Sequence, residues 1–272
     1  MQTDTATGLR HWKNHDEPPL TRDSLEALCA FEIPCIRIKD FAIDAECDEL
    51  IAAMDTVGLN KTYKVPGLVK PPRYVGLTQF EKREGSKEDY FAEVDKAWGE
   101  HEAVLSHMSW NPFDRMWSIM RDLYPENSFE LGQEPGYGRY YAGIIRETSG
   151  GGTLHADVTM YSAREYMISQ VASQITWNFF ASQVEGDGGK TTLHNRPYRV
   201  AARSGDKVEI EGFSRSYVDG AETHIYTPAK GDVVMFNSHN PHEWTAVDEG
   251  QRRMGVSTYI GRMPDGNFIY WS

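Results

Sequence analysis

The chain has 272 residues, and its 28 basic and 40 acidic residues give a formal net charge of −12. This acidity argues against binding to nucleic acid or to an anionic membrane, because both need clustered basic side chains. No apolar run reaches the roughly 18 residues of a membrane span, and the N-terminus lacks the pattern of a signal peptide, so we expect a cytoplasmic protein.

The first 60 residues predict a helix, a strand and a second helix. Residues 22–30 are expected to form a short helix, and Ile33–Phe41 alternates as a strand does. Asp44 has the properties of a helix N-cap. Four apolar residues follow it with helical spacing and predict a buried stripe: Cys47, Leu50, Ile51 and Met54.

Residues 60–84 are rich in proline and predict a loop with short strands. A further helix is expected from Ser86 to about Leu105. Asn111 followed by Pro112 predicts the start of another, since asparagine caps helices well and proline is favoured at the first helical position. That helix should end before Pro125.

From residue 130 onward, short aromatic and β-branched runs alternate with turns, and aromatic residues make up 12% of the whole sequence. Eight runs are predicted to be strands: Tyr137–Ile145, Leu154–Met160, Gln174–Ala181, Lys190–His194, Lys207–Glu211, Thr223–Thr227, Asp232–Asn237 and Met254–Arg262. This number of short strands fits a jelly roll, a double-stranded β-helix of the cupin-like kind. We predict one domain over residues 1–272, with a helix-rich part (1–130) packed on a jelly-roll core (131–272).

His155 and Asp157 are the first candidate metal ligands. Residues two apart on a strand point to the same face, so an imidazole and a carboxylate would project side by side. They are two of the three ligands in the 2-His-1-carboxylate sites of non-haem Fe(II) oxygenases. A His-x-Asp pair also occurs on ordinary surface strands, so a third ligand must decide.

A distal histidine and a basic residue follow about 85 residues downstream. His242 lies 11 residues before Arg253, with the Gly250 turn between them. If the two flanking strands pair, Arg253 returns level with the histidine. Ser257, four residues beyond Arg253, shares its face on an unbroken strand.

This arrangement resembles the motif of the Fe(II)/2-oxoglutarate-dependent oxygenases over about 140 residues, from Tyr137 to the C-terminus. Within that superfamily the chain is similar to the N-substituted (N-succinyl) L-amino acid hydroxylases and the related aliphatic halogenases. That closer likeness rests on three segments: His242–Arg253, Gly188–Thr192 and the closing Ile269–Ser272.

The resemblance implies that His155, Asp157 and His242 bind Fe(II), with 2-oxoglutarate and O2 at the open positions. Arg253, with Ser257 beside it, would pair with the far carboxylate of the cosubstrate through its bidentate guanidinium. The implied activity hydroxylates an unactivated aliphatic C–H bond and releases succinate and CO2. The related halogenases carry glycine where this chain has Asp157, so the carboxylate favours hydroxylation over chlorination.

Two of these assignments have competitors. His239 competes with His242, and the spacing of the family motif favours His242. Arg252 competes with Arg253; neighbours on a strand face opposite ways, so only one can point inward, and the shared face of Ser257 favours Arg253. Two further histidines, His194 and His224, are interpreted as hydrogen-bonded strand residues and not as ligands.

Substrate contacts are less marked in the sequence. Arg164 and Arg73 are candidates for binding a substrate carboxylate, although each could be an ordinary surface arginine. Trp177 lies on a strand expected to line the barrel, where it either contacts the cosubstrate or belongs to the core.

We predict a small-molecule substrate with a carboxylate, such as an N-substituted L-amino acid. A natural-product or protein side-chain hydroxylase on the same core is an alternative. So is a non-catalytic metal-binding cupin-type module, which would not need Arg253. Three cysteines are too few to indicate a disulfide framework, and the sequence leaves a homodimer open.

Overall fold

The structure is a computed structural model that describes residues 3–4, 9–58, 61–62, 72–79, 85–198 and 212–272. The predicted strand Lys207–Glu211 lies outside these residues, as does most of the proline-rich segment 60–84. Among the described residues, no helix is both long and apolar enough to cross a bilayer.

The four predicted helices are present: α1 (Arg22–Cys29), α2 (Asp44–Val57), α3 (Lys87–Leu105) and α4 (Pro112–Leu123). Thr21, Ser86 and Asn111 cap α1, α3 and α4 with their side chains. The N-cap of α2 is Ile43 and not the predicted Asp44, because the carboxylate of Glu46 reaches back to the Ile43 N–H at 3.0 Å. The shorter helical turns are α5 (Thr159–Ser162), η2 (Met167–Gln170) and η3 (Arg215–Val218).

The described strands form one large sheet, one small sheet and two short ribbons. The large sheet runs in the order β3 (Ile36–Ile38), β14 (Val233–Asn237), β11 (Ser173–Phe180), β16 (Met254–Arg262), β9 (Ile144–Glu147), β5 (Arg73–Val75) and β4 (Lys61–Thr62). In addition, β17 (Phe268–Trp271) pairs with β16 and with β6 (Phe129–Leu131). The ribbons are β1 (Thr3–Asp4) with β2 (Leu9–Arg10), and β7 (Gln133–Glu134) with β8 (Gly138–Arg139).

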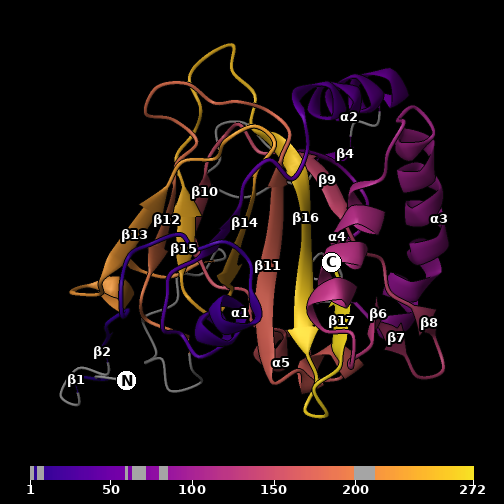
Figure 1. Ribbon diagram of the computed structural model, residues 1–272. Coiled ribbons are helices and arrows are strands. Elements are labelled where there is room, and N and C mark those ends of the chain that lie inside the picture. Colours follow the sequence, from indigo (N-terminus) through magenta and orange to yellow (C-terminus); the bar gives the residue numbers. More distant parts are fainter. Residues whose placement is uncertain (1–2, 5–8, 59–60, 63–71, 80–84, 199–211) are drawn as a thin grey trace.

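The small sheet runs in the order β10 (Gly152–His155), β15 (His242–Trp244), β12 (Thr191–His194) and β13 (Thr223–Tyr226). In Figure 1 it lies to the left of the large sheet, and α2, α3 and α4 lie to the right. One arrangement that the sequence analysis considered is not formed. β15 joins β10 and β12, whereas β16 pairs with β9, β11 and β17, so β15, which carries His242, and β16, which begins just after Arg253, do not form a hairpin.

Three predicted strands are shorter than expected. Ile33–Phe41 forms a strand only over β3, Ile36–Ile38. The segment Tyr137–Ile145 is divided between β8 and β9, and Leu154–Met160 ends as a strand at His155. The remaining five that the structure describes appear within one or two residues of their predicted bounds.

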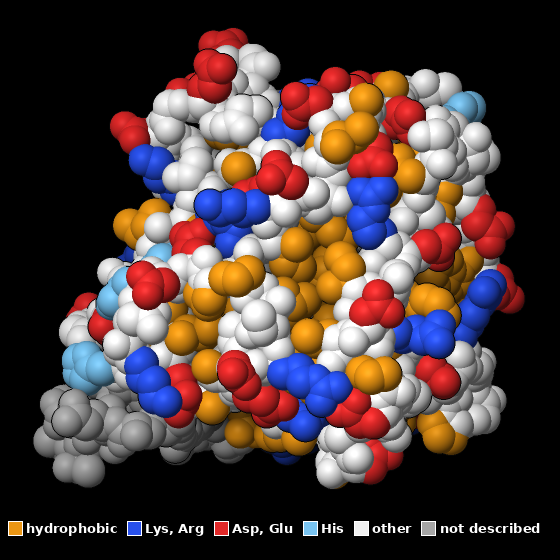
Figure 2. Space-filling view, viewed as in Figure 1, with side chains coloured by type: hydrophobic (Ala, Val, Ile, Leu, Met, Phe, Trp, Pro, Cys, Tyr) orange, Lys and Arg blue, Asp and Glu red, His pale blue; other side chains and the backbone are white. Residues whose placement is uncertain are grey.

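Separate clusters of buried residues hold these layers together. One lies between the large sheet and helices α1, α2 and α4; Leu25, Leu50 and Met116 pack there with Ile175 and Val256. Another joins the two sheets through Phe180, Leu193, Tyr226 and Phe236. The face in Figure 2 mixes acidic and basic side chains, and hydrophobic side chains gather at its centre, where β11 and β16 run between α1 and α4.

Candidate active site

The two candidate histidines lie side by side on neighbouring strands of the small sheet. β10 and β15 are antiparallel, and His155 is the direct partner of His242, with ring centroids 4.3 Å apart. The sequence analysis expected strand alternation to place Asp157 beside His155. Asp157 lies beyond the end of β10, however, so alternation is not the cause. Ser238 holds it instead, accepting from the Asp157 N–H at 3.0 Å and donating its hydroxyl to the Asp157 carbonyl at 2.8 Å.

The potential ligand atoms of these three residues converge. Oδ2 of Asp157 lies 3.5 Å from Nε2 of His242 and 3.9 Å from Nε2 of His155, and all three ligand atoms lie within 4.8 Å of one another. Nδ1 of His155 contacts the Thr153 carbonyl at 2.6 Å, and Nδ1 of His242 contacts the Asn240 carbonyl at 3.0 Å. A proton on each Nδ1 leaves each Nε2 free to bind a metal, so the residues present fit a 2-His-1-carboxylate ion site.

The electrostatics of the cluster favour the metal-binding protonation states. Burial raises the pKa of Asp157, but the hydrogen bond from His242 and the charges of both histidines outweigh it, so the pKa lies below its ordinary value. Burial, assisted by His242, lowers the pKa of His155 to about 4. At neutral pH the cluster therefore presents a carboxylate and a neutral imidazole, which are the forms that coordinate metals.

His239 does not join the cluster. Its ring lies 6.1 Å from that of Phe31, and burial lowers its pKa to about 4. Of the two distal candidates, the structure brings only His242 to Asp157.

The guanidinium of Arg253 is surrounded by aromatic rings and uncharged oxygens. Its guanidinium lies over the rings of Phe180 and Trp244, at 5.1 and 5.4 Å from their centroids. Its side-chain hydrogen bonds go to uncharged oxygens: Thr148 Oγ1 at 2.7 Å, Thr191 Oγ1 at 3.2 Å and Gly189 O at 3.3 Å. Burial lowers its pKa to about 10. Among the described residues, no carboxylate lies within ion-pair distance of Arg253, so its charge is left for another anion.

Arg252 points the other way and is neutralised. It donates to Asp55 at 2.8 and 2.9 Å and to Glu147 at 2.9 Å. Arg73 reaches the same two carboxylates, at 3.5 and 3.9 Å. The guanidinium of Arg73 therefore belongs to this outer cluster and not to the face that carries Arg253, and its role in binding substrate stays a prediction.

Of the two alternatives that the sequence left open for Trp177, the structure shows the core position. Trp177 is 3% exposed and packs in the helix-facing core, 5.5 Å from the ring of Phe41. Its neighbour Asn178 faces the other way and pairs directly with Ser257 on β16. Since side chains alternate along a strand, the inner face of β11 carries Asn178 and not Trp177.

Arg146 is a site residue that the sequence analysis missed. Its Nη2 donates to Ser257 Oγ at 3.1 Å, which puts Ser257 on the inner face as predicted. The charge of Arg146 contributes to lowering the pKa of both His155 and Arg253. It lies one residue beyond the predicted strand Tyr137–Ile145, and extending the alternation of that strand would have found it.

Tyr259 was missed as well, and its side chain is hydrogen-bonded to Asp157. The two-residue period of β16 from Ser257 predicts its inward direction. Arg164, by contrast, is an exposed residue beyond α5; the contact described for it is through its backbone carbonyl, which accepts from Ser169 Oγ at 3.3 Å. Its role in binding substrate stays a prediction.

Comparison with known sequences finds two informative relatives, although no family model matches the chain. A leucinostatins biosynthesis cluster protein S from Purpureocillium lilacinum is 29% identical over 210 residues, covering 75% of this chain and 85% of that protein. An L-γ-glutamyl-L-propargylglycine hydroxylase from Streptantibioticus cattleyicolor is 26% identical over 133 residues, 48% of each chain.

Among solved structures, an N-substituted L-amino acid dioxygenase from Burkholderia ambifaria superposes with a TM-score of 0.55 at 17% identity, covering 92% of this chain and 91% of that one. The same enzyme is known in complex with α-ketoglutarate, which is 2-oxoglutarate, and that structure gives a TM-score of 0.52. In its fold and in its candidate ligand set, the chain resembles the non-haem iron, 2-oxoglutarate-dependent oxygenases, as the sequence predicted.

Proposed function

We propose that this chain is an Fe(II)/2-oxoglutarate-dependent dioxygenase. It hydroxylates an aliphatic C–H bond of a small carboxylate-bearing molecule and releases succinate and CO2. In this proposal the two sheets form the double-stranded β-helix of the family, within one domain over residues 1–272. The observation that carries it is the convergence of His155, Asp157 and His242 in a site that also contains the unneutralised Arg253.

The proposed role of the protein is to hold and orient reactants. Iron(II), when bound by the three ligands, supplies the activation of O2 with 2-oxoglutarate as co-reductant. Arg253 offers a planar fork to a carboxylate, and Thr148 and Thr191 fix the direction of that fork. Burial between Phe180 and Trp244 strengthens the attraction, because a charge pair is screened less away from water.

The charges around the site support an anionic substrate. Arg146 and Arg253 contribute two positive charges and Asp157 one negative, so the described side chains carry a net charge of about +1 at neutral pH. An iron(II) ion and a 2-oxoglutarate dianion cancel each other. One positive charge then remains, and Arg146, which lies against Ser257 with no carboxylate partner among the described residues, is the group that we expect to receive a substrate carboxylate.

The substrate class follows from the two similar enzymes. One is named for N-substituted L-amino acids, and the other for a γ-glutamyl amino acid, whose amino group is acylated. Both substrates combine a carboxylate with a substituted amino group. We therefore propose an N-substituted L-amino acid as the substrate, which agrees with the residual positive charge.

Anaerobic addition of Fe(II) and 2-oxoglutarate tests the proposal. The chelate of both in such a site gives a weak visible charge-transfer band, and we expect this band in the wild-type protein. His155→Ala should abolish it, whereas His239→Ala, a control at a buried histidine outside the cluster, should retain it. Absence of the band from the wild-type protein, or its persistence in His155→Ala, would contradict the proposal.

A further inference from the structure

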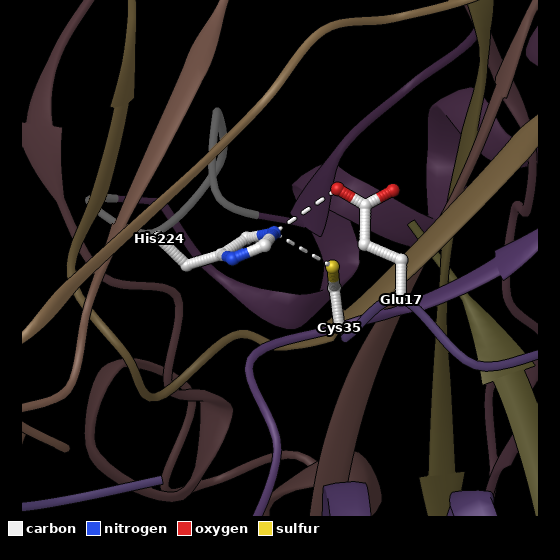
Figure 3. Close-up of side chains that lie close together, drawn as sticks. All are labelled: Glu17, Cys35 and His224. Atoms are coloured by element: carbon white, nitrogen blue, oxygen red, sulfur yellow. Dashed lines mark hydrogen bonds and ion pairs between the residues drawn. The ribbon is translucent and has the colours of Figure 1, made fainter. Parts of the chain in front are cut away.

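A second cluster of potential metal ligands lies on other strands. It consists of Glu17 in the segment before α1, Cys35 just before β3, and His224 on β13 (Figure 3). β13 and β10 lie at opposite ends of the small sheet, so this cluster shares no residue with the candidate iron site. Cys35 is fully buried, His224 is nearly so, and Glu17 is partly exposed.

Both contacts of the His224 ring within this cluster are made by the same atom. Nε2 of its ring lies 3.5 Å from Cys35 Sγ and 3.1 Å from Glu17 Oε1, and Figure 3 shows both contacts meeting at this one nitrogen. A ring nitrogen either donates one hydrogen or accepts with one lone pair. If Nε2 carries a hydrogen, that hydrogen is shared between Glu17 Oε1 and Cys35 Sγ, which is only a weak acceptor; if Nε2 accepts the Cys35 S–H, its lone pair faces a carboxylate.

A cation placed among the three atoms would instead bind all of them as ligands. Zn²⁺ binds thiolate at about 2.3 Å, and imidazole and carboxylate at about 2.0–2.2 Å, in a tetrahedron. Those bond lengths predict separations of about 3.5 Å between S and N and about 3.3 Å between N and O. The separations of 3.5 and 3.1 Å at His224 Nε2 match both edges before any ion is added.

The surroundings supply the outer contacts and the charge balance that such an ion needs. Arg37 donates to Oε2 of Glu17, leaving Oε1 toward the cluster, and also to Asp232 Oδ2 at 3.0 Å. Glu17, Asp232 and a Cys35 thiolate carry three negative charges, while Arg37 and Zn²⁺ together carry three positive ones. Trp12 packs edge-on against His224, with ring centroids 6.4 Å apart.

We propose that Glu17, Cys35 and His224 bind a zinc ion, with water as the fourth tetrahedral ligand, and that this ion fastens the segment before α1 to the edge of the small sheet. Binding releases one proton from Cys35, as the thiol becomes a thiolate ligand, and it needs no oxidant. His224 keeps its proton on Nδ1 and offers Nε2. Interpreting His224 only as a hydrogen-bonded strand residue is then incomplete.

Co²⁺ is a suitable probe, because a thiolate bound to it gives a strong near-ultraviolet charge-transfer band. The candidate iron site contains no sulfur, so the band reports on cysteine alone. Full-length protein carrying His155→Ala and Asp157→Ala, which removes competition from that site, is titrated with Co²⁺ under reducing conditions. We expect saturation near one ion per chain and loss of the band when Zn²⁺ is added.

Variants in that background identify the ligands. Cys35→Ser should abolish the band, whereas Cys29→Ser and Cys47→Ser, matched controls at the other free cysteines, should retain it. His224→Gln and Glu17→Gln should weaken Co²⁺ binding at least about tenfold; they test the site independently if Cys35→Ser folds poorly. No thiolate band in the parent protein, a band that survives Cys35→Ser, or unchanged Co²⁺ affinity in both of the other variants would overturn the proposal and leave a hydrogen-bond network only.

Discussion

Arg252 and Arg253 are adjacent in the sequence, but their side chains point to opposite faces of the large sheet. The two faces differ in the groups that surround each guanidinium. On the outer face, Asp55 and Glu147 neutralise Arg252, and Arg73 joins them. On the inner face, Arg253 contacts only uncharged oxygens and rings. The charge of Arg252 is thus neutralised by the protein itself. The charge of Arg253 has no carboxylate partner among the described residues, so we expect an anionic ligand to pair with it.

The largest effect should come from removing the inner carboxylate. We expect Asp157→Gly to lower hydroxylation by more than about 100-fold. Removing a residue that only hydrogen-bonds to a metal ligand already lowers metal affinity or activity by about 10–100-fold, and removing a ligand itself should cost more. Succinate release coupled to substrate oxidation measures the loss. Full activity in this variant would mean that Asp157 is not a ligand; chlorination in the presence of chloride would instead support the resemblance to the halogenases.

The two arginines provide the direct test of the comparison. Arg253→Ala should weaken 2-oxoglutarate binding by about 2–5 kcal/mol, the range measured when one partner of a buried, hydrogen-bonded charge pair is truncated. Arg252→Ala is the matched control and should leave that affinity unchanged. Titration of the anaerobic Fe(II) charge-transfer band with 2-oxoglutarate gives both affinities. Equal losses in the two variants would remove the distinction between the faces.

His101 shows what happens to a buried base that can lose its charge. It is 1% exposed and contacts the Tyr141 hydroxyl at 2.8 Å, and burial lowers its pKa to about 4 from an ordinary value of about 6.5. The unfolded chain therefore binds more protons in this window. Through His101 alone, the free energy of unfolding should fall by about 3 kcal/mol as the pH drops from about 6.5 to 4.

Denaturant unfolding at several pH values measures this slope, and His101→Phe should flatten it. An unchanged slope in His101→Phe would mean that His101 is not the group responsible. A buried histidine can lose its proton and become neutral, whereas an arginine stays charged. Arg253 therefore needs an anionic partner, and His101 does not.

Arg146→Ala should raise the KM for an anionic substrate by about tenfold or more, since a hydrogen bond to a charged group contributes about 1.5–3 kcal/mol. The KM for 2-oxoglutarate should change less. Steady-state kinetics with each reactant varied in turn separates the two. The reverse pattern would assign Arg146 to the cosubstrate and leave the substrate carboxylate without a partner.

The smallest effect is expected on the outer face. Arg73→Ala removes a partly exposed ion pair and should change the free energy of unfolding by less than about 1 kcal/mol. It should not change the KM of either reactant. A large increase in substrate KM would return Arg73 to the role that the sequence first suggested for it.

Local signals in the sequence predicted the elements well. Thr21, Ser86 and Asn111 cap helices through contacts with residues two or three positions away, so the signal lies within the helix itself. The candidate metal ligands were predicted from the resemblance to a family motif, and the structure brings the three residues together. The position of Asp157 beside His155 was predicted for the wrong reason, because Ser238, a residue far along the chain, holds it there.

Choices that depend on distant partners were predicted less well. Alternation along β11 separates Trp177 from Asn178, but it does not say which side faces the second sheet, and a shift of one residue exchanges the two faces. The pairing of β15 with β10 and β12, instead of with β16, is likewise set between strands far apart in sequence. Such partners are visible only once the sheets are assembled.

The rings of His155 and His242 are both oriented by main-chain carbonyls, those of Thr153 and Asn240. Every amino acid has a carbonyl, so substitution of either residue leaves the acceptor in place as long as the backbone path is kept. The tautomer of each ring is thus set by the path of the main chain, and not by the side chains of Thr153 and Asn240.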